Sequence, residues 1–150
     1  MDPTSVAEGD KLFNRALEAL AAGETPAALA LLERALKQND NPAWHSYLGY
    51  CIAKERGQLK KGADLCHAAM GLEPGNPVHY LNLAKVHLVG GVKREALGVL
   101  REGMALGGSR EIVALLEKIG TRKPPVLSFL SRDNPLNKML GLVLVRLGLR

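Results

Sequence analysis

Small and apolar residues recur along residues 1–108 at helical spacing, and Gly or Pro interrupts them at regular intervals. This pattern is typical of short amphipathic helices joined by tight turns. The composition agrees, because Ala and Leu abound while aromatic residues make up only 4% of the chain. We therefore expect an all-α protein with three helix pairs, over residues 8–22 and 26–38, 43–56 and 59–72, and 77–90 and 93–106.

The expected turns repeat with a period of 34 residues. Gly23, Gly57 and Gly91 keep this step, and Gly in a turn can adopt a positive φ and end a helix. Small residues seven apart in each second helix predict close contact between neighbouring helices. Four further columns share the period: Ala28, Gly62 and Ala96; Leu32, Cys66 and Leu100; Ala35, Ala69 and Gly103; Leu36, Met70 and Met104.

These columns resemble the tetratricopeptide repeat, which has large–small pairs in its first helix, Gly at the turn and small residues around a bulky one in its second helix. The third unit matches best, with Tyr80-Leu81-Asn82-Leu83-Ala84 followed by Gly91, Ala96, Leu100 and Gly103. The second unit departs, because Tyr50 stands where a small residue is usual and Leu48-Gly49 lies one residue early. We interpret this as one extra residue in its first helix. The resemblance covers residues 7–108 and implies a right-handed α-solenoid of three helix-turn-helix repeats.

Two further helices are expected after the repeats. Ser109 is a helix cap and Gly120 a helix stop, so residues 109–120 should form the capping helix that a solenoid needs. We assign residues 1–120 to the solenoid with this helix, and residues 121–150 to a basic linker and an amphipathic C-terminal helix. Asn134-Pro135 starts that helix. Its apolar stripe is predicted to dock on another surface: Leu136, Leu140, Val143 and Leu147.

In tetratricopeptide repeat proteins the first helices line a concave groove that holds peptide or helix ligands. The resemblance places ten residues there: Phe13, Leu17, Leu20, Trp44, Tyr47, Cys51, Val78, Leu81, Lys85 and Leu88. Chaperone-binding members clamp a C-terminal carboxylate, but apolar residues fill the clamp positions here and only Lys85 suits them. The mostly apolar groove instead suits an apolar helix or peptide. Trp44 and Tyr47 are the expected anchors.

The sequence shows no set of residues suited to catalysis or metal binding. Cys51 and Cys66 fall in the two helices of one unit and are expected to be buried. There is no phosphate-binding Gly-rich loop after a strand and no Ser-His-Asp set, so we expect no enzyme activity and no cofactor. Four histidines lack the spacing of a metal site: His45, His67, His79 and His87.

The net charge of +5 resides at the C-terminal end, because residues 109–150 hold eight basic and three acidic residues. The lack of a signal-peptide pattern and the low cysteine content favour a cytoplasmic protein. We expect an adaptor whose groove binds a protein or peptide partner, or the C-terminal helix of the same or a second copy. The alternative is a peripheral membrane-associated assembly factor attached through that helix. Nucleic-acid binding is disfavoured, because no basic helix face carries interleaved aromatic residues.

Overall fold

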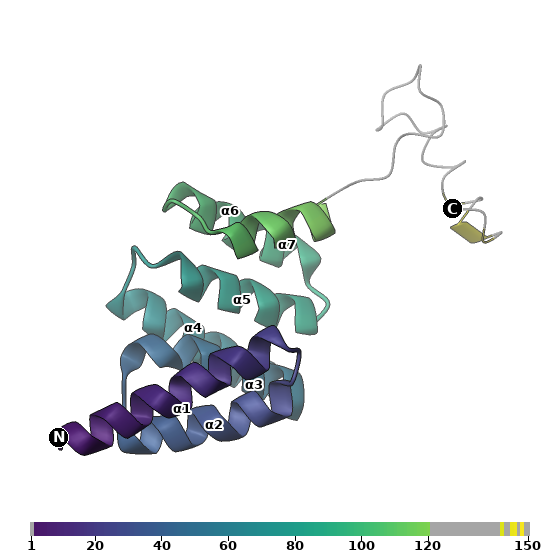
Figure 1. The fold of residues 1–150 in the computed structure, drawn as a ribbon. Coiled ribbons are helices and arrows are strands. Elements are labelled where there is room, and N and C mark those ends of the chain that lie inside the picture. Colours follow the sequence, from purple (N-terminus) through teal and green to yellow (C-terminus); the bar gives the residue numbers. More distant parts are fainter. Residues whose placement is uncertain (1, 121–141, 143–144, 147, 149–150) are drawn as a thin grey trace. The chain divides into compact units, whose positions relative to one another are not determined.

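The computed structural model describes residues 2–120 and residues 142, 145, 146 and 148. The regular elements of residues 2–120 are all helices, joined by short turns (Figure 1). None of the described helices is long and apolar enough to cross a lipid bilayer. The chain divides into two units, Met1–Ile119 and Gly120–Arg150. The helices are α1 (Pro3–Ala21), α2 (Thr25–Gln38), the 3-10 helix η1 (Pro42–Trp44), α3 (His45–Arg56), α4 (Leu59–Leu72), α5 (Pro77–Val89), α6 (Lys93–Ala105) and α7 (Arg110–Gly120).

The predicted helix pairs and capping helix are present, and the largest difference is that α1 begins at Pro3 instead of residue 8. The Asp2 carboxylate accepts a hydrogen bond from the Thr4 amide at 3.2 Å, and Pro3 fits the first helical turn. Asn41-Pro42 and Asn76-Pro77 act in the same way, since each Asn side chain accepts from the amide two residues further on, at 3.0 and 3.1 Å. Each repeat thus starts with an Asx-Pro pair that satisfies a free amide and pre-sets φ.

The turn glycines keep the 34-residue step but differ in the backbone hydrogen bonds that follow them. Gly23, Gly57 and Gly91 all have a positive φ, of +77°, +67° and +76°. After Gly23 and Gly91, the next amide donates to the carbonyl oxygen five residues back, at 2.8 and 2.9 Å. After Gly57, the next amide donates across six residues, to Ile52 at 3.4 Å. The extra residue of the second repeat is therefore absorbed at the C-terminal end of α3.

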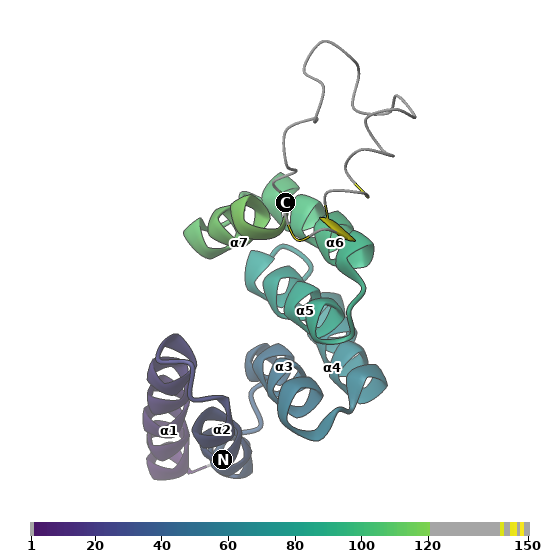
Figure 2. The same cartoon turned by 90° about the vertical axis from the view of Figure 1, so that its right-hand side faces the viewer.

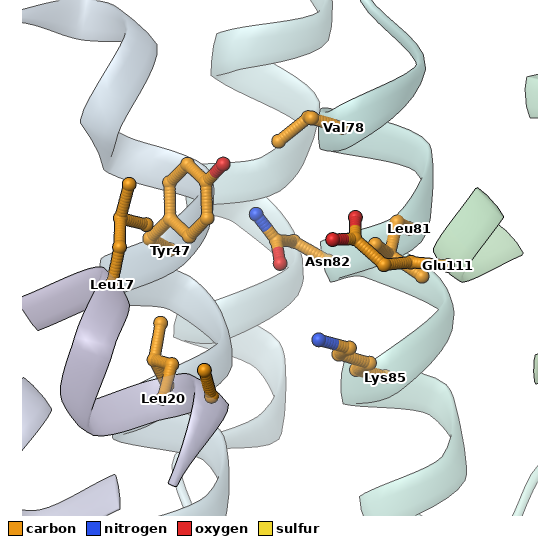
Figure 3. Close-up of a pocket in the computed structure, with 9 residues that line it drawn as sticks. Leu17, Leu20, Tyr47, Val78, Leu81, Asn82, Lys85 and Glu111 are labelled. Carbon is orange, nitrogen blue, oxygen red and sulfur yellow. The ribbon is translucent and has the colours of Figure 1, made fainter. Parts of the chain in front are cut away.

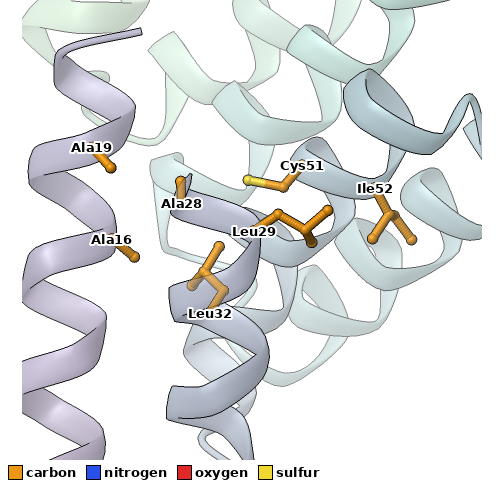
Figure 4. Close-up of a cluster of buried hydrophobic side chains, with 7 residues drawn as sticks. All are labelled: Ala16, Ala19, Ala28, Leu29, Leu32, Cys51 and Ile52. Atoms are coloured by element: carbon orange, nitrogen blue, oxygen red, sulfur yellow. The ribbon is translucent and has the colours of Figure 1, made fainter. Parts of the chain in front are cut away.

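Residues 2–120 pack as helical hairpins in two layers. The first layer holds α1, α3, α5 and α7, and the second holds α2, α4 and α6 (Figure 2). Ala16 of α1 and Ala28 of α2 are fully buried where the first hairpin closes, and Leu32 fills the space beside them (Figure 4). Ile52 of α3 joins the same cluster, so the first two repeats share a core. Packing against the second layer therefore holds α1, α3, α5 and α7 side by side.

Candidate peptide-binding groove

A cleft of about 310 Å³ lies where α1, α3, α5 and α7 face one another. Leu17 and Leu20 of α1 form one wall and lie opposite Val78 and Leu81 of α5, while Tyr47 of α3 closes the back (Figure 3). Ala21, Asn82, Lys85 and Glu111 complete the lining. The cleft is thus built by residues as far as 94 positions apart in sequence, from Leu17 to Glu111. We call it the central cleft.

Two further clefts, each lined by fewer residues, continue the surface toward the C-terminal ends of the first-layer helices. One, of about 300 Å³, lies between α5 and α7 and is lined by Leu81, Lys85, Glu111, Ala114, Leu115 and Lys118. The other, of about 340 Å³, is lined by Tyr50, Lys54, Lys85, Leu88, Val89 and Leu115. Lys85 borders all three clefts. Together we call them the groove.

Seven of the ten residues that the sequence places in the groove line one of these clefts. Six come from the first and third repeats, where the period holds, and Tyr47 comes from the second. The seven are Leu17, Leu20, Tyr47, Val78, Leu81, Lys85 and Leu88.

This arrangement of helix pairs is also known from another protein. No family model matches the sequence, and no curated protein matches it either. The structure is similar to the crystal structure of the Sgt2 TPR domain from Aspergillus fumigatus, with a TM-score of 0.57 and 21% sequence identity. The match covers 91% of this chain and 95% of that one. The chain has the tetratricopeptide repeat (TPR) fold. The predicted all-α, TPR-type fold is therefore confirmed.

Three expected groove residues of this TPR fold lie elsewhere. Phe13 stacks on Trp44 with ring centroids 4.6 Å apart and meets Tyr47 edge-on at 5.3 Å, so these rings join α1 to the start of α3. Trp44 is only 5% exposed and offers little surface to a partner. Cys51 is fully buried against the first repeat. Tyr50, one residue earlier, lines the groove in its place, as the offset of the second repeat requires.

Several residues that line the groove are not among those predicted from the sequence, although the repeat period would have identified one of them. Glu111 and Lys118 belong to α7, which lies beyond the three repeats that the resemblance covers. Lys54 follows from the 34-residue period, which equates it with Leu20 and Leu88. Asn82 is buried by its neighbours yet borders the central cleft.

The charged side chain at the centre of the groove is Lys85. Its ammonium lies 5.2 Å from the centroid of the Tyr50 ring, within the range of a cation–π contact. Burial lowers the pKa of Lys85, and the nearby Lys54 lowers it further, while Glu111 and Cys51 act in the opposite direction. No carboxylate among the described residues pairs with it at salt-bridge distance. Lys85 therefore has donor capacity left for a bound partner.

A buried polar chain links α3 to α5 behind the groove. Asn82 Nδ2 donates to Ser46 Oγ at 2.9 Å, which leaves the Ser46 hydroxyl proton for His79 Nδ1 at 2.7 Å. His79 Nε2 then donates to the Glu73 carboxylate at 2.7 Å. This hydrogen bond to His79 is the main cause of a lowered pKa for Glu73. Among the described residues no buried side-chain nitrogen or oxygen lacks a hydrogen-bond partner, and this chain provides the partners for Ser46, His79 and Asn82.

The Ser46, His79 and Glu73 side chains contain the groups of a hydrolytic triad. Ser46 and His79 are fully buried, however, and neither lines any of the three clefts of the groove. Burial also raises the pKa of both the Cys51 and Cys66 thiols to about 12, which keeps them protonated. Within the described residues, no group of three or more His, Cys, Asp and Glu side chains could hold a metal ion.

Proposed function

We propose that this protein is a non-enzymatic adaptor whose groove binds an apolar helix or peptide. The observation that supports this most directly is the central cleft, in which side chains of α1 and α5 face each other while remaining half-buried. Leu17, Leu20 and Val78 line the cleft and each keeps part of its apolar surface exposed there. A preformed apolar groove of this kind is suited to an amphipathic helix.

The energetics support binding of an apolar segment. Full burial of a leucine or valine side chain contributes about 1.5–3 kcal/mol, so each half-buried side chain that a partner covers contributes on the order of 1 kcal/mol. The groove residues lie on helices whose backs are fixed in the core, so little order is lost on binding. The TPR fold adds support, because solenoids use extended concave surfaces for binding.

One candidate occupant is the C-terminal segment of the same chain or of a second copy. Its predicted stripe, Leu136, Leu140, Val143 and Leu147, lies outside the described residues. The stripe is apolar along about three helical turns, and such a helix needs cover in water. If it docks in the groove, Leu140→Asp or Val143→Asp in the full chain should change the association state seen by light scattering. Unchanged size, stability and partner binding in both variants would contradict this form of the proposal.

The adaptor function is tested by affinity purification with matched surface variants. Val78→Asp places a charge in the central cleft, and Leu72→Asp places the same charge on α4, where Leu72 is 64% exposed and borders no part of the groove. We expect proteins that co-purify with the unchanged chain to be lost with Val78→Asp and kept with Leu72→Asp. Equal retention by both variants would contradict the groove as the binding surface. Circular dichroism verifies that both variants remain helical.

A further inference from the structure

Three lysines lie along one edge of the groove. Lys54, Lys85 and Lys118 each lie in the last two turns of a first-layer helix: α3, α5 and α7. Lys54 and Lys85 border one cleft, and Lys85 and Lys118 border the next. The three side chains therefore form a continuous row, which we call the lysine row. Leu88 and Leu115 line the clefts between them, so the row runs beside apolar surface.

The acidic side chains of the described groove do not cancel this row. Glu111 is the single carboxylate that lines any of the three clefts, and it belongs to the first turn of α7. Figure 3 shows Lys85 and Glu111 both directed into the central cleft, and no ion pair joins them. Lys54 and Lys85 are close enough for Lys54 to lower the pKa of Lys85. A partner carboxylate placed here would meet two ammonium groups that form no salt bridge within the described residues.

We propose that the groove selects an acidic amphipathic helix of another protein, with its apolar face in the central cleft and its Asp or Glu side chains on the lysine row. This inference rests on the proposed function and adds the charge of the partner to it. The apolar clefts require apolar side chains from the ligand, which a nucleic-acid backbone does not offer. Opposite charges across the row provide both specificity and faster association.

The charge of the C-terminal segment disfavours it as the occupant. Residues 134–150 contain three basic residues and no acidic residue. A segment with this charge would face the lysine row with like charges, which is unfavourable at close range. A second protein with an acidic segment therefore fits the groove better than a second copy of this chain does.

The test is selection from a displayed library of random peptides about 15 residues long, or roughly four helical turns. Three versions of the 150-residue chain are immobilised: the unchanged chain, the groove variant Val78→Asp, and a triple variant with Lys54→Gln, Lys85→Gln and Lys118→Gln. We expect the unchanged chain to enrich peptides with apolar residues at helical spacing and an excess of Asp and Glu. The triple variant should still enrich apolar peptides but lose the acidic excess.

Fluorescence anisotropy then measures the best acidic peptide against versions with its carboxylates changed to Gln or Lys. We expect the Lys version to bind more weakly by a factor of up to about ten. This difference in affinity should shrink as salt is added. Enrichment of neutral or basic peptides, tighter binding of a peptide spanning residues 134–150, or displacement by DNA or anionic vesicles would overturn the acidic-partner inference and leave the adaptor proposal standing. Absence of any enrichment over Val78→Asp would contradict the adaptor proposal itself.

Discussion

Gly49 of α3 and Gly62 of α4 touch backbone to backbone where the second helix pair crosses. A methyl group built on either glycine would lie 2.5 Å from the carbonyl oxygen of the other. The equivalent helices of the first repeat meet through Ala16 and Ala28, which are both fully buried. The second repeat therefore brings its two helices closer together than a methyl group on either glycine would allow, and Gly49 rather than Tyr50 makes the contact.

This contact predicts that Gly49→Ala and Gly62→Ala destabilise the protein. In each variant the obstacle is backbone, which must move, so we expect a loss of about 1–3 kcal/mol despite the better helix propensity of Ala. Gly71→Ala is the matched control, since Gly71 also lies in α4 but has open space where the methyl group of Ala would stand. We expect that control to gain up to about 1 kcal/mol. Urea unfolding of the three variants measures the difference, and equal stabilities would show that the helices do not cross here.

The repeat register predicts a second packing effect. Ala28→Leu introduces a bulky group into the closed contact of the first hairpin and should cost about 1–3 kcal/mol. Ala30→Leu on the same helix should cost little, because Ala30 is exposed. Ala96, which occupies the equivalent position in the third repeat, should respond as Ala28 does. Thermal unfolding compares them, and an unchanged melting temperature for both Ala28→Leu and Ala96→Leu would mean that the register is wrong.

The fold could be predicted because its signals are local and repeated. Each turn glycine recurs at the same step, and each helix pair follows from it. The early start of α1 is not predicted even though Asp2-Pro3 carries the same start signal as Asn41-Pro42, because no preceding repeat marks it.

The groove could be predicted only in part, because its lining depends on the rotation of each helix. One extra residue in α3 turns that helix by about 100°, which exchanges Cys51 for Tyr50 at the surface. The link between Ser46 and His79 joins side chains 33 residues apart and follows from the packing of α3 on α5, which no sequence spacing reveals.

The lowered pKa of Glu73 predicts a pH-dependent contribution to stability. A carboxyl group with a depressed pKa in the folded state stabilises it above the unfolded pKa of about 4.3, and this contribution is lost as pH falls through the folded value. Glu73→Gln should therefore be less stable than the unchanged chain at neutral pH, and the gap should close in acid. Denaturant unfolding at several pH values measures the gap. A gap that stays constant with pH would show that the Glu73 charge does not act through His79.

Burial predicts that both cysteines are unreactive in the folded protein. Cys51 and Cys66 are fully buried, and burial raises the pKa of each thiol to about 12. Ellman's reagent in mildly alkaline buffer should label neither thiol in the native protein and both after denaturation. Rapid labelling of a thiol under native conditions would place that cysteine at the surface and would reverse its assignment to the core.

The central claim is that partners bind to the groove formed by the first-layer helices. Site-specific photo-crosslinking tests it most directly, with benzoylphenylalanine placed at Tyr47 in the central cleft or at Leu72 on α4. The full chain carrying either residue is mixed with the tightest-binding peptide from the library and irradiated. We predict a covalent adduct from position 47 and none from position 72. Adduct formation from position 72 alone, or equally from both, would contradict the claim.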